Sequence, residues 1–208
     1  MTGSPDARSR ILDAATRRLA EHGYAGTSLK AVAEDVGIRA PSLLYHFANK
    51  QALRDAVLEA LLSRWKDLVP AVLVAATTGR DRFDGALGLL LGFFAEEPRR
   101  ARLLMRESLD RPEAVRALIG THLAPWLPLL TEYIALGQRE GRVHADLDPS
   151  AYVTEVVLLA VSHFAMSPIA VSVGGGDDPD WEARRLAELR RLCNAALYLP
   201  RPKEPQDG

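Results

Sequence analysis

Apolar side chains between residues 27 and 50 recur at the spacing of two short helices joined by a tight turn. Four of them, at positions i, i+3, i+4 and i+7, line one face of the first predicted helix: Leu29, Val32, Ala33 and Val36. Gly37 can adopt the left-handed backbone conformation that ends a helix, and Ile38 then returns to the core. Pro41 suits the first turn of a second helix, because its missing N–H would have no intrahelical partner there.

The polar positions of this segment are also ordered. Thr27 or Ser28 can cap the first helix by accepting from a backbone N–H in the first turn. In the second helix, Leu43 and Phe47 lie four residues apart and pack against the first helix. The side chains left facing outward are Ser42, Tyr45, His46 and Lys50. Two helices with a short, glycine-containing turn have the geometry of a helix-turn-helix. By spacing alone, the segment also fits an ordinary small helical hairpin.

The rest of the chain has helical periodicity almost throughout. An upstream apolar stripe predicts a supporting helix that ends at Gly23; its members are Ile11, Ala14, Ala15 and Leu19. Downstream, the predicted helices cover 51–69, 81–97, 98–109, 112–140, 149–166 and 178–199. Pro125 and Pro128 should kink the helix over 112–140, and Asp148 with Pro149 should start the helix over 149–166. Residues 167–180 are predicted to be a flexible loop, and 201–208 a disordered tail.

These elements predict an all-α protein of two domains, a helix-turn-helix domain over residues 1–49 and a larger helical domain over 50–200. A chain of 208 residues with 48% hydrophobic content can bury a substantial core. Charge separates the two parts. Residues 1–54 hold eight basic and five acidic side chains, which gives +3, and the whole chain is −1, so the remainder is −4. The basic excess accompanies the helix-turn-helix, as DNA binding requires.

Other features of the composition exclude several classes of protein. No apolar run reaches the roughly 18 residues that cross a bilayer, and Met1–Arg10 has no signal-peptide hydrophobic core, so we expect a soluble cytoplasmic protein. The single cysteine, Cys193, excludes an intramolecular disulfide and is expected to be a small core or interface residue. His46 is expected to donate to a phosphate, because no second metal ligand lies at a suitable spacing.

The segments ILDAATRRLAEHGYAGTSLKAVAEDVGI and SLLYHFANKQAL carry Ala15, Gly23, the Thr27–Ser28 start, Ala33, Gly37, Phe47, Lys50 and Leu53. At these positions the stretch from Arg10 to Leu53 resembles the N-terminal DNA-binding domain of the TetR family of transcriptional regulators. The resemblance implies that a set of side chains approaches DNA: Thr27, Ser28, Lys30, Ala40, Pro41, Ser42, Leu44, Tyr45, His46 and Lys50. Of these, Lys50 would pair with a phosphate.

One position departs from the family pattern. The family usually has tyrosine three residues before its phenylalanine, where this chain has Leu44, and the tyrosine stands instead at Tyr45. A phosphate-contacting hydroxyl can therefore come from a different position, and Leu44 can contact a thymine methyl. Tyr45 also fits a surface aromatic that packs at the edge of the domain.

The resemblance further implies a homodimer on a partly palindromic operator, since one recognition helix reads only a few base pairs. In the family, the last two helices, here about 149–166 and 178–199, form the dimer interface. The middle helices, roughly 81–170, would enclose a pocket for a small effector, whose binding releases DNA; repression is the family default. The pocket candidates are Phe93, Met105, Arg106, His122, Trp126, Tyr133, His163 and Phe164. Each also fits a core or interface residue. An apolar pocket indicates a hydrophobic or aromatic inducer.

An enzyme is not supported by the sequence. There is no G-x-S-x-G, Walker-type glycine loop, H-E-x-x-H or cysteine pair, and the glycines at 174–176 follow no predicted strand. No cofactor, metal or membrane contact is expected. A further alternative is a DNA-binding protein of the same fold without a ligand response, such as an activator or a chromosome or cell-division factor.

Overall fold

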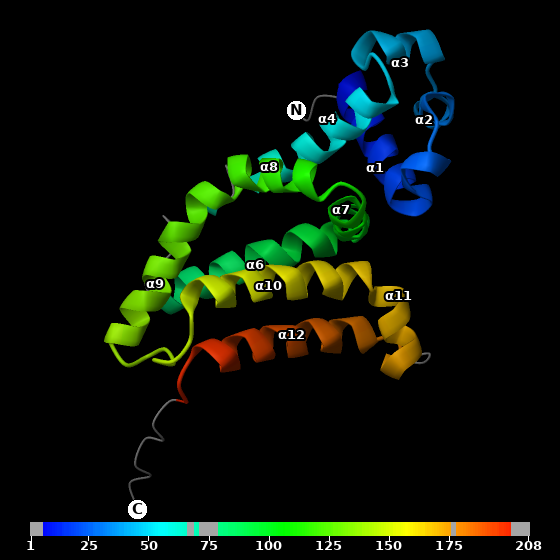
Figure 1. Cartoon of the computed structure of the whole chain (residues 1–208). Coiled ribbons are helices and arrows are strands. Elements are labelled where there is room, and N and C mark those ends of the chain that lie inside the picture. The colour runs from blue at the N-terminus through cyan, green and yellow to red at the C-terminus, as the bar shows by residue number, and fades with distance from the viewer. Residues whose placement is uncertain (1–5, 66–68, 71–78, 176–177, 201–208) are drawn as a thin grey trace, which may run out of the picture.

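The computed structural model describes residues 6–65, 69–70, 79–175 and 178–200 (Figure 1). Within these ranges the regular elements are all helices, apart from one isolated antiparallel bridge between Val143 and Tyr198. In chain order they are α1 Ala7–Gly26, α2 Leu29–Val36, α3 Ala40–His46, α4 Lys50–Ser63, α6 Gly79–Glu96, α7 Arg99–Asp110, α8 Pro112–His122, the 3-10 turn η1 Ala124–Trp126, α9 Leu127–Arg139, α10 Pro149–Ala165, α11 Ser167–Ala170, the π-turn η2 Val171–Gly175 and α12 Trp181–Leu197. The predicted all-α class is confirmed.

The predicted helix-turn-helix is present as α2 and α3. Ser28 caps α2, and its hydroxyl accepts from the Ala31 N–H at 3.1 Å. Gly37 ends α2 in the left-handed region, at a φ of 73°, where a side chain would be strained. Below the two helices lies a small core of buried apolar residues: Ile11, Ala15, Val32, Ala33, Leu43 and Phe47.

The first helix departs from its predicted end. Gly23 has a φ of 68° and interrupts the helical backbone, yet a further turn runs on to Gly26. The Thr27 hydroxyl donates to the Gly23 carbonyl at 2.8 Å, so the interruption is held by a hydrogen bond. The glycine therefore kinks α1 instead of ending it.

The long linking helix is present over Lys50–Ser63, but it ends earlier than the predicted position 69. α4 begins at Lys50 behind an Asn49 cap, whose side chain accepts from the Ala52 N–H at 2.8 Å. It ends at Ser63. Residues 66–68 of the predicted helix, and the predicted tail over 201–208, lie outside the described residues.

Two predictions downstream need correction. The helix expected over 112–140 is broken into α8, η1 and α9, because Pro125 cannot supply the N–H that would continue the ladder. The loop expected over 167–180 is helical up to Gly175: the Met166 carbonyl accepts from the Ile169 and Ala170 N–H groups, both at 3.0 Å. Pro168 lies in the first turn of α11, where its missing N–H costs no hydrogen bond, so it is compatible with a helix.

In the larger domain α10 is the central helix. It packs against α7, α9 and α6, and α12 runs alongside it (Figure 1). The predicted start of α10 is confirmed, because the Asp148 side chain accepts from the Ala151 N–H at 2.7 Å. The N-terminal helices attach through α1, which packs on α7, and through α4, which packs on α8.

Membrane-spanning potential is confined to one bent pair. No single described helix is both long and apolar enough to cross a bilayer, and only Pro149–Ala165 together with Ser167–Gly174, bent by 73°, meets the criteria of length and composition.

Candidate functional site

The first candidate site is the outer face of α3. Tyr45 is 89% exposed and Leu44 46% exposed, whereas Leu43 and Phe47 of the same helix are buried. Ser42 and Pro41 are exposed, and Ala40 and His46 are half-buried. The Tyr45 and His46 rings contact edge to face, with centroids 5.5 Å apart. One helix therefore presents aromatic, polar and apolar groups to an external partner while its other face anchors it.

The three predicted DNA-contacting residues around the start of α2 differ in their exposure. Ser28 is exposed, although its hydroxyl already accepts from the Ala31 N–H. Lys30 is also exposed, with Nζ 3.9 Å from a Glu34 carboxylate oxygen. Thr27 is only 3% exposed, and its hydroxyl is bonded to Gly23. Its position favours a role inside the domain over the predicted contact with DNA.

Lys50 is turned toward the end of α1. Its Nζ donates to the Ala25 carbonyl at 3.4 Å and lies 4.3 Å from the centroid of the Tyr24 ring. The sequence suggested a side chain directed outward toward phosphate. In the structure these two contacts instead hold the ammonium against the end of α1. A phosphate would have to compete with them.

A basic residue that was not among the predicted DNA contacts lies next to the outer face of α3. Arg39 is exposed and occupies the N-cap position of α3. Helical periodicity does not place Arg39 on the outer face, because the residue precedes the helix. An exposed cation at this position would reach the phosphate backbone of a DNA duplex that α3 contacted.

Where the two domains meet, a buried ion pair joins α4 to α7. Arg54 Nη2 lies 2.6 Å from Glu107 Oε2, and Nε donates to both carboxylate oxygens. Glu107 is 1% exposed, and the Arg54 guanidinium also lies over the Tyr24 ring at 4.4 Å. Arg106 packs on Gly23, where a Cβ would approach its Nη1 to 2.7 Å. The kinked end of α1 is thus fitted closely to α7.

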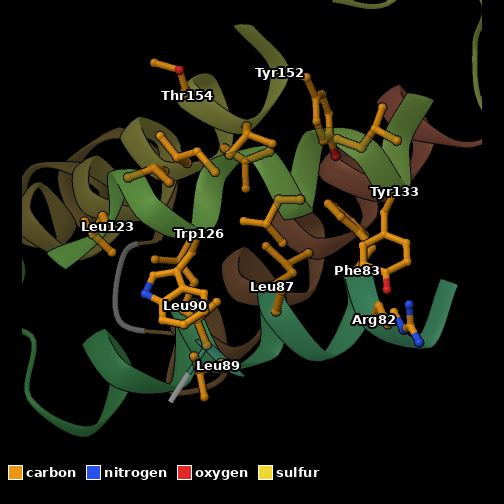
Figure 2. Close-up of a pocket in the computed structure, with 18 of the residues that line it drawn as sticks. Arg82, Phe83, Leu87, Leu89, Leu90, Leu123, Trp126, Tyr133, Tyr152 and Thr154 are labelled. Atoms are coloured by element: carbon orange, nitrogen blue, oxygen red, sulfur yellow. The ribbon is translucent and has the colours of Figure 1, made fainter. Parts of the chain in front are cut away.

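The second candidate site is an apolar cavity of about 300 Å³ in the larger domain (Figure 2). Its walls come from α4, α6, α7, α8, α9, α10 and the end of α12. Leu62, at the end of α4, and Trp65 also line it, so the helix that follows the helix-turn-helix forms part of the cavity wall. This volume lies at the small end of the range for ligand pockets.

The structure places two of the predicted pocket residues at the cavity and six elsewhere. Trp126 and Tyr133 line the cavity. The other six are not among its described lining residues: Phe93, Met105, Arg106, His122, His163 and Phe164. Helical periodicity predicts which residues are buried, but it does not show which of them border a cavity.

Other contacts explain several of those six positions. Phe93 packs against Trp65, with ring centroids 4.8 Å apart, and belongs to the solid core. His122 is buried with Nε2 2.9 Å from Glu59 Oε1, which joins α8 to α4. Burial, and then the cation of Arg185, lower the pKa of His163 below its ordinary value, which favours a neutral imidazole.

Two further tyrosines line the cavity without having been predicted. The Tyr152 hydroxyl donates to the Cys193 carbonyl at 2.6 Å, and burial raises the pKa of Tyr152 far above its ordinary value. Tyr198 lies beside Phe83 with ring centroids 5.9 Å apart.

Cys193 is buried, as expected, and burial raises the pKa of its thiol. A neutral thiol of this kind is a packing group.

A third feature is an apolar surface on the last helices. α10 exposes Leu158 at 55% and Leu159 at 46%, and α12 exposes Leu192 at 50%. The two helices run side by side in Figure 1. Among the described residues, no group of three or more His, Cys, Asp or Glu side chains is placed to hold a metal ion.

Comparison with known proteins bears on both candidate sites. Residues 11–57 match the sequence model of the bacterial regulatory proteins of the tetR family. A ketosteroid transcriptional regulator from Mycobacterium tuberculosis is similar in fold, with a TM-score of 0.73 at 15% identity, covering 95% of this chain and 97% of that one. The matched family and this neighbour are regulators and not enzymes.

Two more solved structures cover nearly the whole chain. A regulator from Saccharomonospora viridis, solved in complex with choline, has a TM-score of 0.71 at 21% identity and covers 93% of this chain and 98% of that one. A protein whose structure addresses the control of antibiotic production by bacterial hormones has a TM-score of 0.64 at 25% identity, covering 94% and 100%. The fold of both domains, beyond the 47 matched positions from 11 to 57, is therefore shared with known regulators.

Proposed function

We propose that the chain is a ligand-responsive repressor of the tetR family of bacterial regulatory proteins, whose sequence model its residues 11–57 match, and that it binds a partly palindromic operator as a homodimer. A small hydrophobic or aromatic molecule in the cavity releases it from DNA. Such a regulator acts in the cytoplasm, where the chromosomal DNA lies.

The observation that carries this proposal is the position of α4. Its first turns pack against the DNA-binding helices, with Arg54 stacked on Tyr24 of α1, and its last turn contributes Leu62 to the cavity wall. A ligand that changes the preferred position of Leu62 acts on the helix that directly follows α3 in the chain and packs on α1. The coupling is limited by the difference in ligand affinity between the DNA-binding and DNA-free conformations.

The homodimer is supported by the exposed leucines of α10 and α12. Three exposed leucines on adjacent helices are an apolar surface suited to a second copy of the chain. Dimerisation through these helices would place two α3 helices on one side of the assembly, as reading two half-sites about one turn of DNA apart requires. The thermodynamic consequence is a large gain in operator affinity over a single recognition helix.

Selection of binding sites from random DNA, followed by footprinting, tests the DNA-binding part of the proposal. We expect a site with two related halves and a complex that holds two protein chains by analytical ultracentrifugation. Leu192→Glu, at a 50% exposed position of α12 outside the described cavity lining, should shift the protein toward monomer and weaken operator binding, while Leu109→Glu, at an 80% exposed position on α7, should do neither. Recovery of no enriched sequence would refute the proposal.

A further inference from the structure

The cavity reaches the surface between α9 and α10. Four of its described lining residues are exposed, and one of them, Arg142, lies in the loop after α9 and pairs with Glu140. The other three are Leu127, the first residue of α9, and Thr154 and Leu158 of α10. α9 and α10 pack against each other, and Figure 1 shows them diverging away from the loop that joins them. We call Leu127, Thr154 and Leu158 the rim of the cavity mouth.

The rim is apolar in character. Leu127 is 37% exposed and Leu158 is 55% exposed, although both line the cavity. The Thr154 hydroxyl donates to the Ser150 carbonyl at 2.8 Å, so its proton is already used within α10. No described segment of the chain covers the rim, because its three residues remain exposed. An apolar ligand in the cavity would keep part of its surface in water at this mouth.

The rim is continuous with the apolar surface that the proposed homodimer buries. Leu158 belongs to both, because it lines the cavity and is one of the exposed leucines of α10 and α12. Its neighbours on that surface, Leu159 and Leu192, are not among the described lining residues. A second copy of the chain seated on these leucines therefore lies against Leu158, at the edge of the mouth.

We infer that the second copy of the chain covers the mouth of the cavity, so that each ligand site is complete only in the dimer. This inference rests on the proposed homodimer and adds a role of the interface in regulating the same cavity. The two-fold symmetry of such a dimer covers both cavities in the same way. A ligand below the partner would contact the interface as well as Leu62 of α4, so it would act on the relative position of the two copies.

The accessibility of the mouth can be measured without a ligand. Leu127→Cys places a thiol on the rim, and Leu136→Cys is its matched control, because Leu136 is also 37% exposed on α9 but is not a described lining residue. Iodoacetamide should modify Leu127→Cys about tenfold or more slowly in the dimer than in a monomeric Leu192→Glu background, since the rate follows access to the thiol. Leu136→Cys should react equally in both. The parent protein gives the background from the buried Cys193.

Binding of an uncharged apolar probe, N-phenyl-1-naphthylamine, tests whether the cover contributes to the site. Two of the three tryptophans, Trp65 and Trp126, line the cavity, so quenching of tryptophan fluorescence reports binding. The dimer should bind the probe about tenfold more tightly than the Leu192→Glu monomer, the gain for roughly 55 Å² of apolar surface removed from water. Leu159→Glu, also outside the described lining, should match Leu192→Glu, and Leu109→Glu should match the parent.

The same coupling must appear in the dimerisation equilibrium. Saturating probe should lower the dissociation constant of the dimer about a hundredfold, tenfold for each of the two sites, because linkage between binding and association is reciprocal. Sedimentation of the Leu192→Glu variant over a range of concentrations, with and without probe, gives this ratio. Circular dichroism of each variant checks that the chain is folded.

The outcomes separate this inference from the proposed function. Equal modification of Leu127→Cys in the dimer and the monomer, or equal probe affinity of the two forms, shows that the second copy does not complete the site. Either result overturns the inference and leaves the homodimer and the ligand response standing. If the parent chain binds its operator and sediments only as a monomer, the proposed homodimer fails, and the inference fails with it.

Discussion

The DNA-binding unit and the larger domain use apolar and aromatic side chains in opposite ways. In α3, buried and exposed roles are divided between residues: Leu43 is fully buried, and Tyr45 two positions later is 89% exposed. In the larger domain the residues that border the cavity, such as Leu90, are also part of the core. A change on α3 can thus alter function without altering stability, whereas a change at the cavity affects both.

The contact between the two regions should give the largest effect. Glu107→Ala leaves the Arg54 guanidinium buried without its carboxylate, so we expect a loss of about 3–5 kcal/mol in the free energy of unfolding, measured by urea denaturation. The control is Glu113→Ala, which removes a surface pair with Arg116 and should cost no more than about 1 kcal/mol. If both variants lost the same free energy of unfolding, the buried pair of Arg54 and Glu107 would contribute no more to stability than a surface pair.

Two adjacent leucines of α6 test whether the cavity is open in solution. Leu91 is fully buried and is not a described lining residue of the cavity, so Leu91→Ala should cost about 2–5 kcal/mol in stability. Leu90 borders the empty space and has fewer neighbours to lose, so Leu90→Ala should cost less. Thermal and chemical denaturation give both values, and equal costs would indicate that the cavity is closed or filled.

At the exposed face of α3, stability and function should separate. Tyr45→Ala should change the free energy of unfolding by less than about 0.5 kcal/mol, since the side chain that is removed is 89% exposed. The same variant should weaken operator binding by about 1–3 kcal/mol, the range for a specific base contact, in a fluorescence anisotropy titration. Unchanged affinity would assign Tyr45 to the surface and leave Leu44 and Arg39 as the readers.

The smallest effect concerns pH and the contact between α1 and α2. Hydrogen bonding from Arg18, with Nε 2.6 Å from Asp35 Oδ2, holds the pKa of Asp35 below its ordinary value. A lowered pKa adds stability above the ordinary value of 3.8, and this stability is lost as the pH falls through the folded-state pKa. Asp35→Asn should therefore be less stable than the parent by up to about 1 kcal/mol at neutral pH and equal to it in acid. A difference that persists in acid would point to packing.

Local patterns predicted the N-terminal unit well for physical reasons. Ser28, Gly37 and Pro41 each act on the backbone within a few residues, so their roles can be read without knowing the fold. The same holds for the Asp148 cap of α10. Prolines were harder to interpret, because a proline is compatible both with a break and with the start of a helix. Pro125 broke a helix that it was expected to kink, and the segment after Met166, predicted to be a loop, formed helical turns.

The sequence by itself determined the all-α class, the helix-turn-helix and the exposed aromatic and polar positions of α3, because these depend on spacings of three or four residues. Only the tertiary structure decided which apolar side chains enclose a cavity and which fill the core. Arg82, Tyr133 and Tyr152 come from three helices far apart in the chain, and no local pattern brings them to one end of a cavity. The pairing of Arg54 with Glu107, separated by 53 positions, has the same origin: a buried charge is stable only where the fold supplies its partner.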